Sequence, residues 1–99
     1  MELKWTQEAL ERLFEIEAFI AKDSPERAAT FVDLLIGHVE SSLPDNPRLG
    51  RTVPEIANPD IRELLFRNYR IVYRLTGTRI QILTVFEGHR LLRNEEIDR

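Results

Sequence analysis

The sequence predicts an α+β domain in which an N-terminal strand and an antiparallel two-helix hairpin pack with a small antiparallel sheet. Two amphipathic segments with helical spacing lie in the first half, and three β-rich segments joined by short turns lie in the second half. The chain has 99 residues, which suits one compact core. We therefore expect residues 1–99 to form a single domain.

The first half begins with a short strand and an amphipathic helix. Leu3 and Trp5 alternate with charged residues, and this two-residue period is typical of a strand. From about residue 7 to residue 22, apolar residues recur every three or four positions and glutamates occupy the opposite side, which predicts a helix. The predicted apolar stripe of this helix comprises Leu10, Leu13, Phe14, Ile16, Ile20 and Ala21.

A second helix is predicted from Ser24 to about Ser42. Ser24 is a good N-cap, and Pro25 fits the first helical turn because its missing N–H is not needed there. The short link between the two periodic segments predicts an antiparallel hairpin. The predicted buried positions of the second helix are Ala28, Val32, Leu35, Ile36 and Val39.

Residues 43–59 are predicted to form a structured loop. The segment contains Gly50 and four prolines, which exclude a continuous helix or a central strand. We expect three apolar side chains of this loop to pack against the body of the domain, namely Leu49, Val53 and Ile56.

Three antiparallel strands are predicted near residues 62–66, 69–75 and 79–86, because the connections between them are only two or three residues long. Successive side chains of a strand point to opposite faces. One face of the middle strand therefore carries Tyr69, Ile71, Tyr73 and Leu75 and suits the core. The other face carries Arg70, Val72 and Arg74, and we expect it to suit an acidic partner.

The net charge of −3 hides an asymmetry along the chain. Residues 1–47 carry 4 basic and 10 acidic side chains, whereas residues 48–93 carry 9 basic and 4 acidic ones. All nine basic residues of the second segment are arginines, whose planar guanidinium pairs bidentately with carboxylates or phosphates. These arginines either recognise a partner or simply solvate a face of the sheet.

Several classes of protein are disfavoured by composition. The chain has no cysteine, and its two histidines, His38 and His89, are far apart, so we expect no disulfide, no metal site and no cofactor. The N-terminus lacks the pattern of a signal peptide, and no apolar run approaches the roughly 20 residues of a membrane span. We therefore expect a cytoplasmic protein without a membrane partner.

The order and spacing of short sequence words resemble the RelE/ParE superfamily of toxin–antitoxin toxins, and specifically its ParE branch. The resemblance covers nearly the whole chain. Its words are Ala9-Leu10, Ile20-Ala21, Ser24-Pro25-Glu26-Arg27-Ala28, Phe31, Asn46-Pro47-Arg48-Leu49-Gly50-Arg51, Pro54-Glu55, Arg62-Glu63-Leu64, Tyr69-Arg70-Ile71-Val72-Tyr73-Arg74, Ile82-Leu83-Thr84-Val85-Phe86 and His89-Arg90.

The resemblance implies two alternative activities. ParE-like members are non-nucleolytic poisons of DNA gyrase that a ParD-like antitoxin neutralises, whereas RelE-like members are ribosome-dependent messenger RNA endonucleases. Binding a polyanion normally requires a basic surface, but this chain is net acidic and has only two lysines. The sequence therefore favours a gyrase-binding toxin without catalytic residues and without direct nucleic-acid binding. A degenerate member that serves only as an antitoxin ligand is a third hypothesis.

The candidate residues for binding gyrase or the antitoxin lie in the basic C-terminal region. They are Arg62, Arg67, Arg70, Arg74, Glu87, His89 and Arg90. Under the endonuclease alternative, four of these arginines would stabilise the scissile phosphate, and Glu87 or His89 would move protons.

Overall fold

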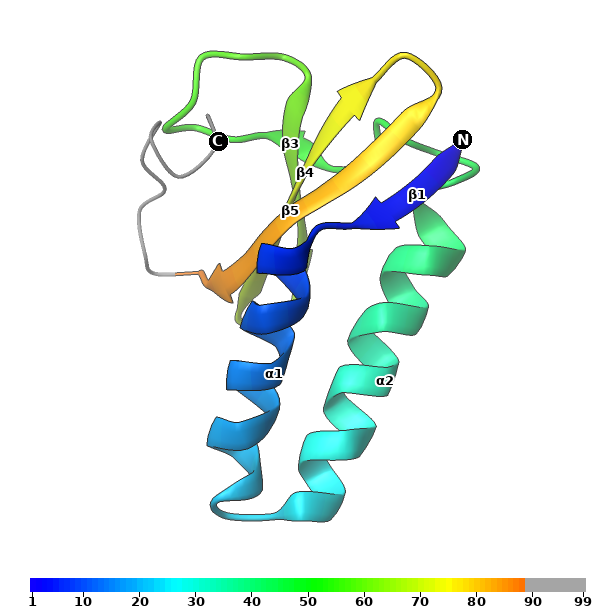
Figure 1. Ribbon diagram of the computed structural model, residues 1–99. Helices are drawn as coiled ribbons and strands as arrows, with labels where there is room; N and C mark the ends of the chain where they lie inside the picture. Colours follow the sequence, from blue (N-terminus) through cyan, green and yellow to red (C-terminus); the bar gives the residue numbers. More distant parts are fainter. Residues whose placement is uncertain (89–99) are drawn as a thin grey trace.

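The structure confirms the predicted α+β class, with an N-terminal strand, a helix hairpin and a sheet (Figure 1). It is a computed structural model and describes residues 1–88. The elements in chain order are β1 (Glu2–Trp5), α1 (Gln7–Ala21), α2 (Pro25–Ser42), β2 (Arg51–Thr52), β3 (Ile61–Phe66), β4 (Tyr69–Thr76) and β5 (Arg79–Glu87).

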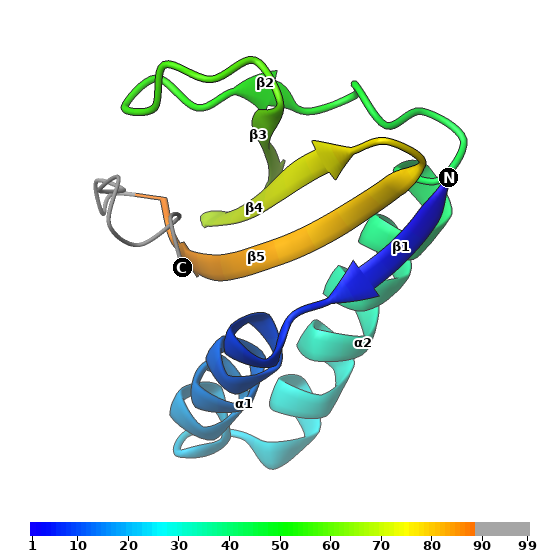
Figure 2. The ribbon, with the colours of Figure 1, turned by 45° about the horizontal axis from the view of Figure 1, so that its top comes forward.

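The five strands form one sheet in the order β1-β5-β4-β3-β2. Strands β3, β4 and β5 are antiparallel neighbours, as their short connections predict. Strand β1 instead pairs in parallel with β5 (Figure 2). In this pair Leu3 lies opposite Ile80 and Trp5 opposite Ile82. The sheet is therefore mixed, with one parallel pair among antiparallel ones. The parallel pair arises because the first strand of the chain adds to the edge of the last one. Strand β2 was not predicted, since two residues show no periodicity.

The two helices form a hairpin on one face of the sheet and extend beyond it at their connected ends (Figures 1 and 2). The Thr6 side chain caps α1 by accepting a hydrogen bond from the Ala9 N–H at 3.1 Å, and Ser24 caps α2 through the Arg27 N–H at 3.2 Å. Each cap satisfies a backbone donor that the helix itself leaves unpaired. The predicted helix boundaries hold to within a residue.

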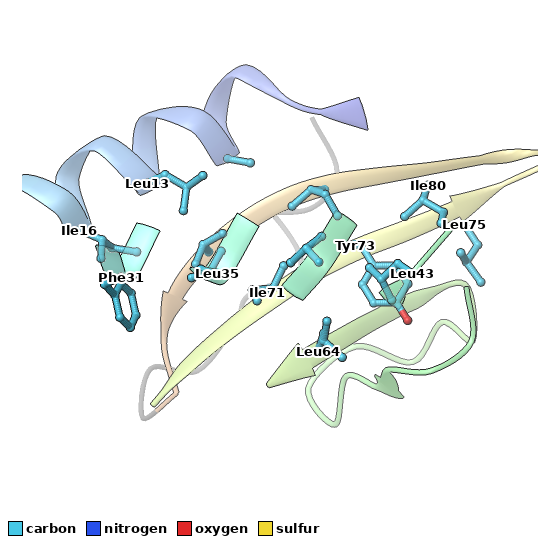
Figure 3. Close-up of a cluster of buried hydrophobic side chains, with 14 residues drawn as sticks. Leu13, Ile16, Phe31, Leu35, Leu43, Leu64, Ile71, Tyr73, Leu75 and Ile80 are labelled. Atoms are coloured by element: carbon cyan, nitrogen blue, oxygen red, sulfur yellow. The ribbon is translucent and has the colours of Figure 1, made fainter. Parts of the chain in front are cut away.

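The main core lies between the hairpin and the sheet and includes Leu13, Ile16 and Leu35 (Figure 3). Helix α1 turns a narrower stripe to the sheet than we predicted. Ala9 is buried, while Leu10 and Phe14 are 43% and 70% exposed.

Helix α2 also buries a somewhat different set of residues from the predicted one. Ala28, Leu35 and Val39 are buried as predicted, and so is Phe31, which we did not predict. Val32 and Ile36 were predicted to be buried but are only half-buried. One side of the helix hairpin therefore presents apolar side chains to solvent instead of burying them against the sheet.

A second, smaller core lies on the opposite face of the sheet, under the segment of residues 51–60. It contains Val53, Ile56, Ile61, Val72 and Phe86. The burial of Val53 and Ile56 confirms the prediction for this loop, whereas Leu49 is 48% exposed and the prediction for it was wrong. This face was expected to be open to an acidic partner, and the loop covers its middle instead.

Tyr73 links the main core to the loop. Its side chain is fully buried, as its face predicts. Its hydroxyl accepts a hydrogen bond from the Gly50 N–H at 2.9 Å and donates one to the Pro47 carbonyl at 2.8 Å. A Cβ at position 50 would lie 2.5 Å from the Glu63 carbonyl oxygen, so only glycine allows the loop to approach this closely.

Replacing Tyr73 by phenylalanine should cost about 1–3 kcal/mol at neutral pH, because the buried Gly50 N–H and Pro47 carbonyl lose their partner. Burial raises the pKa of the Tyr73 hydroxyl above its ordinary value of 10.0. The unfolded chain therefore releases this proton first, and the contribution of Tyr73 to stability is present below about pH 10 and falls as the pH rises further.

Urea unfolding between pH 7 and pH 11 measures both effects. The wild-type free energy of unfolding should fall above pH 10, and the fall should be shallower in Tyr73→Phe. Tyr69→Phe is the control for the other tyrosine, whose pKa is raised by burial and by the nearby carboxylate of Glu87. Equal stability of wild type and Tyr73→Phe at pH 7 would contradict the proposed role of the hydroxyl.

Candidate partner-binding surface

Arg70, which was predicted to face a partner, is buried in a network of ion pairs. Its side chain is 6% exposed, and its two terminal nitrogens each lie 2.8 Å from an oxygen of Glu55. Its Nε donates to Glu63, which is fully buried, at 2.9 Å. The hydrogen bonds to Glu55, and after them the hydrogen bond and the negative charge of Glu63, raise the pKa of Arg70. The positive charge is therefore neutralised inside the fold.

This network holds the loop on the sheet. Glu55 belongs to the loop and Arg51 to β2, whereas Glu63 and Arg70 belong to β3 and β4. Arg51 completes the set by lying 2.8 Å from the second oxygen of Glu63. Each buried charge thus has an opposite charge beside it, which burial of a charge requires.

Arg62 also contacts the loop. Its Nη1 donates a hydrogen bond of 2.8 Å to the Gly50 carbonyl, and the side chain is half-buried. Arg74 lies farther along the sheet and is half-buried, on β4 opposite Gln81. Two of the predicted binding arginines, Arg62 and Arg70, therefore fix the loop in place.

Arg67 and Glu87 lie together at the other end of the sheet. Glu87 is exposed at the end of β5 and pairs in register with Tyr69, and the Gly88 N–H donates to the Asn68 carbonyl at 2.7 Å. His89 and Arg90 lie outside the described residues. Of the seven candidates, the structure thus places Arg67 and Glu87 at one exposed edge.

A groove lies beside Arg67, between α2 and the turn that joins β3 to β4. Its volume is about 570 Å³. We call it the Arg67 groove, and it is lined by Ile20, Glu26, Arg27, Thr30, Phe31, Leu34, Arg67, Asn68 and Tyr69. Sequence reasoning identified Arg67 but missed Arg27, which α2 brings to the same groove.

A second hollow, which we call the hairpin groove, lies between α1 and α2. Its volume is about 200 Å³, and it is lined by Leu10, Leu13, Phe14, Glu17, Val32 and Ile36. Sequence reasoning had assigned Leu10 and Phe14 to the core. The available signal was the width of the apolar stripe of α1, which exceeds what one helix buries on one sheet face. Apolar side chains gathered at an exposed hollow are typical of a protein-binding surface.

The described part of the chain contains neither a metal site nor a membrane-spanning helix. Residues 1–88 contain no group of three or more His, Cys, Asp or Glu side chains placed to hold a metal ion. Over the same residues, no helix is both long and apolar enough to cross a membrane.

Comparison with known proteins identifies the class. Residues 3–92 match the family described as the ParE toxin of the type II toxin-antitoxin system, parDE. The chain is thus a toxin of a type II toxin–antitoxin system, as its sequence words predict. It belongs to the ParE toxin family.

Two relatives agree with this assignment. A protein of Sinorhizobium fredii named "Putative toxin Y4kP" is 38% identical over an alignment of 89 residues, and the match covers 88% of each chain. A solved structure described as the chromosomal ParDE TA system from P. aeruginosa is similar in fold, with a TM-score of 0.73 and 30% identity. The match covers 88% of this chain and 95% of that one.

Proposed function

We propose that this ParE-family toxin inhibits DNA gyrase by binding it, without catalysing a reaction, and that a ParD-like antitoxin neutralises the toxin. Membership of the ParE family supports the proposal. The observation that carries the choice between binding and RNA cleavage is the state of Arg70. A cation that stabilises a scissile phosphate must be free to reach it, but Arg70 is buried between Glu55 and Glu63.

The covering loop supports the same choice. Residues 51–60 close the middle of the sheet face on which Arg70 lies, through a core that includes Val53, Ile56 and Phe86. Arg62 is bonded to the Gly50 carbonyl. An RNA substrate would have to displace this loop and leave the carboxylates of Glu55 and Glu63 without their cation. Occupancy of a protein surface needs no such rearrangement.

For the antitoxin, we propose that an amphipathic helix docks in the hairpin groove. Leu10, Phe14, Val32 and Ile36 offer the apolar wall that such a helix needs. Glu17 lines the same groove, and residues 1–47 carry 10 acidic against 4 basic side chains. We therefore expect the docking helix to carry lysine or arginine beside its apolar anchors, because charge complementarity sets the partner and the association rate.

A pair of assays tests the proposed activity. Purified toxin should inhibit supercoiling by purified gyrase and should leave messenger RNA intact on programmed ribosomes. The reverse pattern would overturn the proposal and identify a ribosome-dependent nuclease. Inactivity in both assays, without growth inhibition on expression, would instead identify a degenerate member.

The variant Glu87→Ala/His89→Ala should retain inhibition of growth and of supercoiling. A general acid or base typically contributes about 10²–10⁴-fold each, so a nuclease that relied on these groups should collapse. A binding protein loses only contacts, and most interface side chains cost less than about 1 kcal/mol on truncation. Transcript cleavage that wild type shows and this variant lacks would contradict the prediction.

A further inference from the structure

We infer that the Arg67 groove is a second docking site for the antitoxin, and that it takes an extended segment in which a carboxylate lies beside an apolar side chain. This inference rests on the proposed neutralisation by an antitoxin and adds a position and a chemistry to it.

The backbone of Arg67 has an unfavourable conformation for an arginine. Its φ is 55°, and no other non-glycine residue among the described ones has a positive φ. The turn has two central residues, Arg67 and Asn68, between the paired residues Phe66 and Tyr69. Hairpin turns with positive φ at the first central position alone prefer glycine there. Backbone preference therefore does not account for an arginine at this position, whereas a role for its side chain does.

The guanidinium is held by two aromatic rings. Its central carbon lies 5.3 Å from the centre of the Phe66 ring and 5.6 Å from that of Phe31. A guanidinium placed over a ring keeps N–H donors in its own plane, and these donors match the two oxygens of a carboxylate. The rings thus fix the position of a carboxylate-binding group before any partner arrives.

The groove also holds a second arginine without an ion pair. Among the described residues, no carboxylate forms an ion pair with Arg67 or Arg27, whereas Arg12 and Arg51 each pair with one carboxylate and Arg70 pairs with two. Glu26 lines the groove as well, so the three charged lining residues sum to one positive charge. An acidic group of a partner is the complement of that charge.

The other lining residues suit an apolar neighbour of the carboxylate. Phe31, Leu34 and Ile20 provide apolar wall, and Leu34 is 48% exposed. Thr30 and Asn68 provide hydrogen-bonding groups at the same groove. An extended peptide segment can contact both parts of the lining at once. Its polar backbone can form hydrogen bonds, and its successive side chains can alternate between apolar and acidic residues.

The position of α2 identifies the antitoxin as the source of this segment. Val32 and Ile36 of α2 line the hairpin groove, and Phe31 and Leu34 of the same helix line the Arg67 groove. The two grooves are thus separated by one helix, whose diameter with side chains is about 10–12 Å. A chain that fills the hairpin groove reaches the Arg67 groove within a few extended residues.

The test uses two short probe peptides and the full-length toxin. One peptide is acetyl-Ala-Leu-Asp-Glu-Leu-Ala-amide, and the other carries Asn and Gln in place of Asp and Glu. Backbone amide shifts of isotope-labelled toxin report the binding position and the affinity. The acidic peptide should shift the amides of Arg27, Thr30 and Asn68. It should also bind at least about fivefold more tightly than its amide counterpart, since bonds to charged groups are the stronger ones.

The variant Arg67→Gly should weaken binding of the acidic peptide at least about tenfold, as expected for loss of an anchoring arginine. Its melting temperature should equal or exceed that of wild type, because glycine adopts a positive φ without strain. Arg79→Ala, which removes an exposed arginine at the start of β5 and at the opposite end of the sheet, should leave the affinity unchanged. Arg67→Lys keeps the charge but not the planar donors, and should bind with intermediate affinity.

Equal affinity for the two peptides, shifts that lie elsewhere on the toxin, or unaltered binding by Arg67→Gly would each overturn the inference. The supercoiling assay with wild-type toxin contains neither the antitoxin nor a peptide, so it reports on the proposed gyrase inhibition alone. Failure of the peptide test with continued gyrase inhibition and antitoxin binding would therefore remove the second docking site alone, and failure of those assays would remove the proposed function.

Discussion

Replacing Glu63 by alanine is expected to destabilise the fold by about 3–5 kcal/mol, the usual cost of breaking a buried ion pair from one side. Glu63 is 1% exposed and accepts hydrogen bonds from Arg70 on one oxygen and from Arg51 on the other. Its loss takes away one of the two carboxylates that pair with the buried Arg70 within residues 1–88. Chemical denaturation at neutral pH, followed by circular dichroism, measures the change.

Two further variants separate the buried charge from other effects. Glu63→Ala/Arg70→Met should recover part of the loss, because the buried guanidinium is then absent and a methionine can fill its space. Glu55 then loses Arg70 and Arg51 loses Glu63, but these two side chains are 17% and 60% exposed, so water can solvate their charges. Arg12→Ala breaks an ion pair whose two side chains are 34% and 62% exposed, and should cost less than about 1 kcal/mol. A Glu63→Ala protein as stable as Arg12→Ala would show that the network does not hold the loop.

The sequence predicts which face of the sheet each side chain of β4 occupies, but not whether that face is covered. Alternation placed Tyr73 on the core face and Arg70 on the opposite one, and both placements are confirmed. Alternation cannot tell whether a face is covered, because the cover comes from residues 51–60 and depends on long-range contacts. Val72 and Phe86 on the same face were the available hint, since two apolar side chains there indicate a second core.

The sheet partners of β1 show a second limit of local patterns. Short turns reveal that β3, β4 and β5 are consecutive neighbours, and this was predicted. The pairing of β1 with β5 joins residues almost 80 positions apart, as in the contact of Leu3 with Ile80. No turn length encodes such a pair, so a strand could be predicted at residues 2–5 but its parallel partner could not.

The geometry of the candidate binding surface could be predicted only in part, for related reasons. The turn at Arg67 follows from its position between two strand-like segments, but its positive φ and its two aromatic neighbours depend on the folded chain. The hairpin groove could not be predicted from the sequence. Helical periodicity shows which side of a helix is apolar, but it does not show how many of these apolar residues the sheet can cover. Leu10 and Phe14 lie at the outer margin of that stripe.

Phe14 supports the second large prediction, which concerns neutralisation. Phe14→Asp should weaken binding of the ParD-like antitoxin by at least about 2 kcal/mol, roughly 30-fold, because aromatic anchors in apolar grooves are typical hot spots. The groove already contains Glu17, so a second carboxylate opposes an apolar helix there. Phe14 is 70% exposed, and the fold should change in stability by no more than about 0.5 kcal/mol.

Phe19→Asp is the matched control for this prediction. Phe19 is on the same helix and is 68% exposed, but it does not line the hairpin groove. Isothermal titration of each toxin variant with the ParD-like antitoxin gives the affinities, and co-expression gives the rescue of growth. Phe14→Asp toxin should resist rescue while Phe19→Asp toxin is rescued like wild type. If both variants lose affinity equally, the antitoxin binds along the exposed side of α1 in general, and the hairpin groove is not its docking site.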